Sequence, residues 1–245
     1  MWLSGQTRPD LGFVTSAAAQ RTMKATVSDI KSLNRAVELA HQHAGEGIVF
    51  RRGVVDMKGA AIVSFGDSAF ANVEGCKSQF GTVLCLTNQP DLVAQGRFDL
   101  CAPIAWVSGT VKRVVRSTLA AEAYAISEAL ETGELCRTFL SEAFSPSVSL
   151  KGLDDQMTRA IYVHTDAMNL KTTCMRDCGS VADKRLRIVV AMLRESFQSS
   201  RNTHLAWIAT GKMVADALTK AMDTGILRRF FETVACKQHE GKFVA

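Results

Sequence analysis

Residues 60–87 read AAIVSFGDSAFANVEGCKSQFGTVLCLT and contain two of the strands that decide the fold. Apolar and β-branched residues are concentrated at Ala60–Gly66, at Lys77–Thr87 and again at Pro103–Ser108. This composition favours β-strands over helices. Three such segments in close succession predict an antiparallel meander.

The remainder of the chain alternates between helices and strands. We expect, in order, a helix at 117–140, a strand at 159–165, helices at 167–175 and 181–199, a strand at 204–208 and a last helix starting near Lys212. A meander followed by such alternation predicts the α/β class. The expected architecture is a mixed five-stranded sheet, with three antiparallel strands followed by parallel additions and with helices on both faces.

The first 55 residues are too few to bury a core alone. Within them we expect an irregular lead at 1–25, an amphipathic helix at 26–43 and a strand at 48–55. This organisation predicts three parts. They are a leader, 1–55, a main domain, 56–235, and a C-terminal tail, 236–245.

The composition indicates a protein with reduced thiols and a mild excess of positive charge. The seven cysteines include no C-x-x-C pair, which argues against a disulfide framework. No apolar signal segment opens the chain, and no run of about 18 apolar residues occurs, so neither secretion nor a membrane span is expected. We therefore expect a cytoplasmic or nuclear protein. The net charge of +5 permits a polyanionic partner without establishing one.

Two acidic residues continue apolar patterns. Asp67 follows Val63 and Phe65 on one face of the first strand, because alternate residues of a strand share a face. Glu122 lies in or beside the apolar stripe of the long helix, four residues before Ile126. Neither position is typical of a solvent-exposed acid.

Two further acids occupy positions that suit a binding site. Asp166 follows the strand at 159–165 directly, and the carboxyl ends of strands are where α/β sheets place ligands. Asp216 falls on the expected last helix, three residues after Met213.

Each of these acids also has a purely structural explanation. Asp67 fits a turn, and Glu122 fits a solvated helix position if the apolar stripe is displaced by one residue. Asp166 fits the cap of the following helix. Asp216 fits an ion pair with a lysine four residues before or after it. No spacing rule links the four acids, so pattern alone raises the hypothesis of a site without deciding it.

Gathering these acids in one place would require cations. Carboxylates beside apolar groups are unfavourable without compensation, and converging carboxylates repel one another. Two divalent ions roughly 3.5–4 Å apart relieve that repulsion and serve in phosphodiester cleavage. Oxygen ligands favour Mg²⁺ or Mn²⁺.

Several segments, in their order along the chain, resemble the ribonuclease H domain of copia-type LTR retrotransposon polyproteins. GDSAFAN (66–72) and KSQFGTVLCL (77–86) resemble its first two strands, and IAWVSGTVKRVVRSTLAAEAYAISEAL (104–130) resembles its third strand, basic linker and acidic helix. VHTDAMNLK (163–171) and HLAWIATGKMVADALTK (204–220) resemble the segments with its last two aspartates. The resemblance runs from about Asp56 to Met222.

A second, shorter resemblance precedes it. SGQTRPDLGFVTSAAAQ (4–20) is similar to the tail of the reverse transcriptase that precedes this domain in such polyproteins. A remnant of that reverse transcriptase is therefore expected in the leader, and the rest of the polyprotein is a candidate partner.

The resemblance implies a ribonuclease H-like fold and an activity. Asp67, Glu122, Asp166 and Asp216 fall on the family's catalytic and metal-binding acids. They would hold two Mg²⁺ ions, with Mn²⁺ as a substitute, and the chain would be an endonuclease that cuts the RNA strand of RNA–DNA hybrids. One metal would activate water and the other would stabilise the leaving 3′ oxygen.

Departures from the family pattern leave a second hypothesis open. Ala120 stands where the family often has another glutamate, and no histidine occurs between Ala209 and Met222, where related nucleases use one to aid product release. The polymerase half is missing, since the only Asp-Asp pair, Asp154–Asp155, is interpreted as part of a loop. The alternative is a decayed or repurposed fragment that binds nucleic acid without cutting it.

Two sets of basic residues are candidates for contacts with phosphates. One set precedes the acidic helix and the other shares a face of the helix at 181–199. They are Lys112, Arg113 and Arg116, and Lys184, Arg187 and Arg194. An ordinary solvated surface is the alternative for both sets.

Three ring-bearing residues near these segments are interpreted as packing residues. Trp106 and Trp207 lie in expected strands, and aromatic side chains in strands usually pack in the core. His164, two residues before Asp166, is likewise interpreted as a packed histidine.

Overall fold

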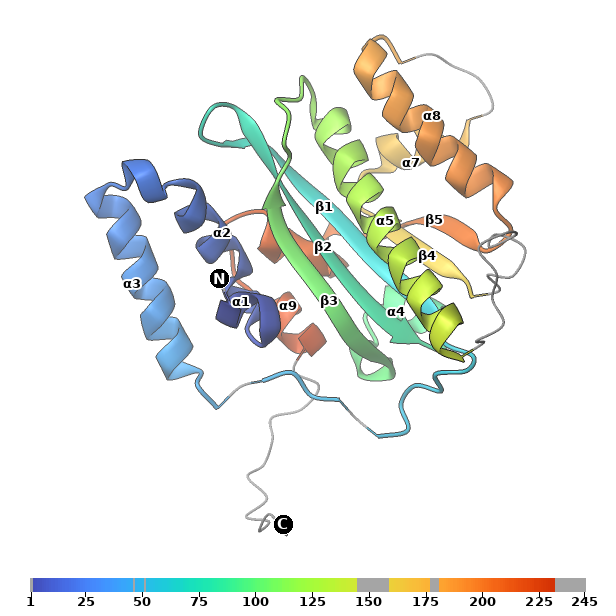
Figure 1. Cartoon of the computed structure of the whole chain (residues 1–245), viewed down its shortest axis with the longest axis horizontal. Coiled ribbons are helices and arrows are strands. Elements are labelled where there is room, and N and C mark those ends of the chain that lie inside the picture. The colour runs from blue at the N-terminus through green and yellow to red at the C-terminus, as the bar shows by residue number, and fades with distance from the viewer. Residues whose placement is uncertain (1, 46, 51, 145–158, 177–180, 232–245) are drawn as a thin grey trace.

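The computed structural model describes residues 2–45, 47–50, 52–144, 159–176 and 181–231, and its centre is one β-sheet (Figure 1). The strand order across the sheet is β3-β2-β1-β4-β5. The strands are β1, Ala61–Val73; β2, Lys77–Thr87; β3, Cys101–Thr110; β4, Ile161–Thr165; and β5, Thr203–Trp207. Residues 154 and 155, the acid pair interpreted as a loop, lie outside the described residues.

The pairing of the strands confirms the expected mixed sheet. β1 and β2 are antiparallel, as are β2 and β3, whereas β4 adds parallel to β1 and β5 adds parallel to β4. β1 has 13 residues and β4 has 5. Because β4 pairs with β1 only from Ile62 to Phe65, β1 continues past the carboxyl end of β4.

Three helices cover one face of the sheet. They are α5 (Thr118–Phe144), α7 (Met168–Met175) and α8 (Lys184–Ser199). Their apolar residues bury the inward-facing side chains of the strands, including Ile62 of β1 and Val163 of β4, both with no exposed surface. Burial of such side chains is the main source of stability for this layer.

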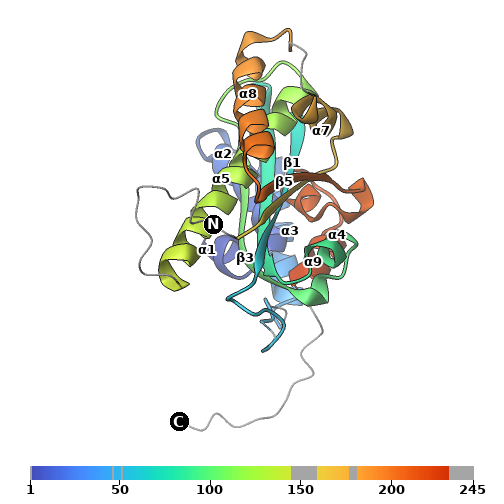
Figure 2. The same cartoon turned by 90° about the vertical axis from the view of Figure 1, so that its right-hand side faces the viewer.

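The opposite face has a second apolar layer. It contains α4 (Pro90–Ala94), the 3-10 helix η5 (Val214–Leu218) and α9 (Gly225–Phe231), packed on Val63 and Phe65 of β1. Figure 2 shows α5 and α9 on opposite sides of the strands. Helices on both faces are therefore confirmed. None of the described helices is long and apolar enough to span a membrane.

The N-terminal segment is more ordered than expected. The prediction of an irregular lead at 1–25 is wrong, because α1 (Trp2–Gln6) and α2 (Gly12–Gln20) form before the expected helix, α3 (Val27–Gln42). The buried Gln79 side chain of β2 joins α2 to the sheet. Its Nε2 donates to Ser16 Oγ at 2.9 Å, and its Oε1 accepts from the Gln20 amide at 3.1 Å. Satisfied buried hydrogen bonds of this kind tie the leader to the main sheet.

Two other expected elements are corrected. The described part of 48–55 contains no strand; its backbone forms one bond to the C-terminal region, from Val49 N to Phe231 O at 3.3 Å, and no ladder. The expected helix near Lys212 is instead a pair of 3-10 turns, η4 (Thr210–Lys212) and η5, with α9 following. All five residues of η5 are buried, and this tightly packed segment forms a 3-10 helix where an α-helix was expected.

Two glycines allow these layers to approach the sheet. A Cβ on Gly66 of β1 would lie 3.0 Å from the Ala125 carbonyl oxygen of α5. A Cβ on Gly81 of β2 would lie 2.8 Å from the Ala215 carbonyl oxygen and 2.7 Å from Leu218 Cβ, both in η5. Backbone this close to a strand tolerates only glycine.

We expect Gly81→Ala to lower the free energy of unfolding by about 1–3 kcal/mol, because overpacking a full core forces backbone shifts. Urea unfolding followed by circular dichroism measures this change. Gly45→Ala is the matched control, since a Cβ there meets no atom within 4 Å. Equal stability of the two variants would contradict the close packing of η5 on β2.

Candidate metal centre

Asp67 lies on β1 just beyond the end of β4. It is 3% exposed and is placed opposite Gly81 in the register with β2. Its Oδ2 accepts a hydrogen bond of 2.6 Å from the hydroxyl of Thr219, which follows η5. Asp67 is therefore part of a buried strand and not a turn residue.

Asp166 directly follows β4, as expected from the sequence. Its Oδ2 accepts from Thr210 Oγ1 at 2.7 Å, and its main-chain oxygen accepts from the Trp207 indole N–H at 3.0 Å. The helix cap is not its role, because α7 begins after Ala167 without a side-chain cap. The Asp166 carboxylate is thus held by the segment that follows β5.

Glu122 extends from the first turns of α5 toward β1. Its side chain is partly buried, so it is not a solvated helix acid. Ser68 Oγ donates to its Oε1 at 2.9 Å, while Oε2 is buried and has no hydrogen-bond partner among the described residues. A buried carboxylate oxygen without a donor is unfavourable unless a cation approaches it.

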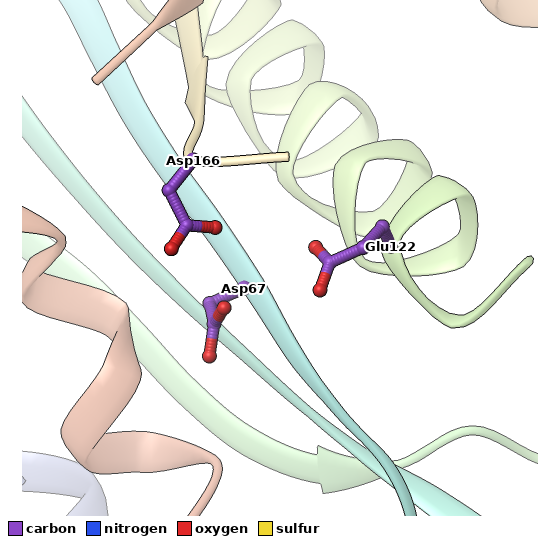
Figure 3. A group of neighbouring side chains, drawn as sticks. All are labelled: Asp67, Glu122 and Asp166. Carbon is purple, nitrogen blue, oxygen red and sulfur yellow. The ribbon is translucent and has the colours of Figure 1, made fainter. Parts of the chain in front are cut away.

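These three acids meet in one group. One oxygen from each of Asp67, Glu122 and Asp166 lies within 4.8 Å of the others. Figure 3 shows their side chains converging from β1, from α5 and from the end of β4. The greater length of β1 explains why these acids meet. Because β1 continues past the end of β4, Asp166, which follows β4, lies beside Asp67 of β1.

Asp216 borders this group without completing it. It lies in η5, is 6% exposed and pairs with Lys220 Nζ at 2.7 Å. The ion pair with a lysine four residues away is thus present. The same carboxylate also lies near enough to raise the pKa of Asp67 and, more weakly, of Glu122.

The electrostatics of the site oppose ionisation. Burial, together with the charges of Asp216 and Asp166, raises the pKa of Asp67 to about 7, against the lowering effect of the Thr219 hydroxyl. Burial and the charge of Asp67 raise the pKa of Glu122 to about 8, against the Ser68 hydroxyl. Clustered carboxylates with raised pKa values are typical of functional sites.

The donor set of this group fits a divalent cation. All three donors are carboxylate oxygens, which hard cations such as Mg²⁺ and Mn²⁺ prefer. The unpartnered Oε2 of Glu122 is an available ligand atom. Asp67, Glu122 and Asp166 are therefore the residues that could hold a metal ion, with Asp216 at the border.

Some residues around the acids were not found from the sequence. They are Ser68, Thr210 and Thr219, whose hydroxyls donate to the three acids. A signal existed only for those beside an acid in the chain. Ser68 follows Asp67 directly, whereas the ion pair of Asp216 with Lys220 was one of the alternatives expected from the sequence.

The aromatic predictions have mixed outcomes. Trp207 is 44% exposed, so its assignment to the core is wrong. It belongs to β5, which is an edge strand, and its indole N–H donates to the Asp166 carbonyl oxygen. Trp106 is partly buried against Phe231, and its indole N–H donates to the Ser4 carbonyl oxygen at 2.7 Å. His164 is buried and stacks on Phe65 with ring centroids 5.2 Å apart, which confirms a packed histidine.

The first basic set and the start of α8 are solvent-exposed. The exposed residues are Lys112, Arg113, Arg116, Lys184 and Arg187. Arg194 differs, because its Nε and Nη2 donate to the Thr173 carbonyl oxygen at 3.0 and 2.7 Å. Its guanidinium holds the end of α7.

No protein-family model matches the sequence, and no curated protein matches it. Solved structures that match the chain include ribonuclease H proteins. RNase H1 from the halophilic archaeon Halobacterium salinarum is 16% identical, with a TM-score of 0.40, and the match covers 65% of this chain and 94% of that one. LC11-RNase H1, isolated from compost, is 17% identical with a TM-score of 0.41, covering 65% and 92%.

The same LC11-RNase H1 has also been solved in complex with an RNA/DNA hybrid. In that structure the identity is 14% and the TM-score 0.39, with 64% of this chain and 93% of that one covered.

We expect the free energy of unfolding, measured without divalent cations, to fall as the pH rises from 6.5 to 8. The native state keeps protons on Asp67 and Glu122, with pKa values of about 7 and 8, that the unfolded chain has already released. His164 acts in the opposite direction only below pH 6.5, because burial lowers its pKa to about 4. Urea unfolding in EDTA at several pH values measures the slope.

The control for this slope is the double variant Asp67→Asn, Glu122→Gln, which removes both titrations and should flatten it. A wild-type slope equal to that of the double variant would contradict the raised pKa values.

Proposed function

We propose that the chain is a divalent-metal-dependent nuclease that cleaves the RNA strand of RNA–DNA hybrids. The observation that carries the proposal is the approach of three carboxylates within 4.8 Å, one of them with a buried oxygen that has no hydrogen-bond partner in the described part of the chain. The order of sequence motifs that resemble copia-type ribonuclease H domains supports the choice of substrate.

Asp67, Glu122 and Asp166 would hold the metal ions, with Asp216 as a fourth ligand. Two Mg²⁺ ions are the expected cofactors, with Mn²⁺ as a substitute. Bound there, they would activate water and stabilise the departing 3′ oxygen. Ligation by Asp216 would require its carboxylate to be shared with Lys220 or released from it.

The protein itself would bind and orient the hybrid. Lys112, Arg113 and Arg116 precede α5, the helix that carries Glu122 in its first turns, so their charges lie near the acidic group along the chain. With Lys184 and Arg187 they offer exposed cations for phosphates. Recognition would depend on hybrid shape, phosphates and 2′-hydroxyls, because protein side chains cannot read the bases of an A-form groove.

We further propose a copia-type origin for the chain. Residues 1–55 would then be a remnant of the preceding reverse transcriptase, 56–235 the nuclease domain and 236–245 a tail. The rest of such a polyprotein is a candidate partner, and the cytoplasm or nucleus the expected location.

The purified chain with Mg²⁺ is expected to cut the RNA strand of an end-labelled RNA–DNA hybrid. Glu122→Gln and Asp166→Asn should each reduce the rate by more than about 100-fold, because ligands of one site act as a unit. Denaturing gels of the labelled strand give the rate. Glu128→Gln, an exposed acid on the same helix, is the matched control and should cut normally.

Activity that persists in Glu122→Gln and Asp166→Asn would reject this site. Hybrid binding without any cleavage, in Mg²⁺ or in Mn²⁺, would favour the alternative of a repurposed fragment.

Removing two positively charged side chains should weaken binding of the hybrid and reduce the salt dependence of that binding. For Lys112→Gln with Arg113→Gln, we expect the slope of log K against log salt to fall by about 1 for each phosphate that these side chains neutralise. Fluorescence anisotropy at several salt concentrations measures the slope. Arg201→Gln is the control, because Arg201 is exposed and precedes β5 at the end of the sheet opposite Asp166. An unchanged slope in the double variant would place the phosphates elsewhere.

A further inference from the structure

Each acid of the metal group accepts a hydrogen bond from one hydroxyl. Ser68 donates to Glu122 at 2.9 Å, and Thr210 donates to Asp166 at 2.7 Å. Thr219 donates to Asp67 at 2.6 Å. Hydrogen bonds to ionised oxygens at such lengths are stronger than neutral ones and fix the orientation of the carboxylate.

Each of these hydroxyls belongs to a different segment from the acid it contacts. Ser68 of β1 contacts α5, Thr210 of η4 contacts the end of β4, and Thr219, after η5, contacts β1. The three bonds therefore connect the segments that carry the acids. A shift of any one segment would change the distances between the carboxylates.

These bonds leave ligand atoms available. The Ser68 hydroxyl contacts only Oε1 of Glu122, and the other oxygen, Oε2, is buried without a partner among the residues that the structure describes. Thr210 and Thr219 likewise contact only Oδ2 of their acids. One oxygen of each carboxylate is thus held by a hydroxyl, and among the residues that the structure describes Oε2 of Glu122 remains for a cation.

We propose that Ser68, Thr210 and Thr219 are positioning residues that set the three carboxylates for a divalent cation before it arrives. The proposal rests on the metal site of the proposed function. Hydrogen bonds from outside a metal's ligand shell orient the ligands, and their loss typically weakens metal binding 10–100-fold. The residues act through the acids and need not touch the metal or the substrate.

The three hydroxyls should differ in importance. Thr219 is fully buried, and its Oγ1 also lies 2.9 Å from the Asp216 carbonyl oxygen, so it connects two acid-bearing segments where no water can replace it. The Thr219 hydroxyl has one proton, and we assign it to the hydrogen bond with Asp67, because that contact is shorter and its acceptor is a carboxylate. Thr210 is exposed, so water can partly substitute for its hydroxyl.

The test is calorimetric titration of the full chain with Mn²⁺. We expect Thr219→Val to weaken Mn²⁺ binding 10–100-fold. The effect should be smaller for Ser68→Ala and smallest for Thr210→Val. Thr219→Ser, which keeps the hydroxyl, should bind within about threefold of the wild type. Thr132→Val is the matched control, because the Thr132 hydroxyl contacts only a main-chain oxygen of α5 on the exposed surface.

The outcomes separate the two proposals. Wild-type protein that binds no Mn²⁺ rejects the metal site and the positioning role with it. Mn²⁺ binding that is equal in the wild type, Thr219→Val and Ser68→Ala rejects the positioning role alone. A loss as large in Thr219→Ser as in Thr219→Val also rejects it, because the hydroxyl would then not be the cause. Should Thr219→Val unfold, Ser68→Ala and Thr210→Val decide the question. Mn²⁺ binding that is weaker in Ser68→Ala than in Thr210→Val supports the positioning role, and binding equal to the wild type in both variants rejects it.

Discussion

Repulsion between carboxylates beside the carboxyl end of β4 is the constraint on which the rest of the site depends. Asp67, Glu122 and Asp166 bring like charges within 4.8 Å in a place where burial raises the pKa values of the first two. Such a group is unfavourable for folding on its own. The surrounding structure must therefore stabilise the group, and a divalent cation bound between the three carboxylates would relieve their repulsion.

The fold meets this constraint through unequal strand lengths and close packing. β1 extends beyond β4, so Asp67 of β1 lies beside Asp166, the residue that follows β4. Gly66 allows α5, with Glu122, to approach one face, and Gly81 allows η5, with Asp216, to approach the other. The packing of the two layers on the sheet therefore places the segments that carry Glu122 and Asp216.

The N-terminal helices are connected to the same region. Gln79 contacts Ser16 of α2 through its side chain, and its main-chain N–H donates to Asn72 Oδ1 at 3.1 Å. The Asn72 amide in turn donates to the Thr219 carbonyl oxygen at 2.8 Å. A hydrogen-bonded path thus leads from the leader to the residue that holds Asp67. The leader supports the segment of the fourth acid, although its sequence indicated no such part.

The sequence by itself determined the five strands of the sheet and the long helix, because alternation and helical periodicity are properties of neighbouring residues. The same patterns made Asp67, Glu122 and Asp166 candidates without deciding that these acids meet. The extent of β2, for example, agrees with its apolar pattern from Lys77 to Thr87. Only the tertiary structure decided which groups surround those acids. The hydroxyls lie 54, 44 and 152 residues from the carboxylates they contact, and no local pattern encodes such pairs. The 3-10 form of η5 was decided in the same way, by packing between β2 and the C-terminal segment.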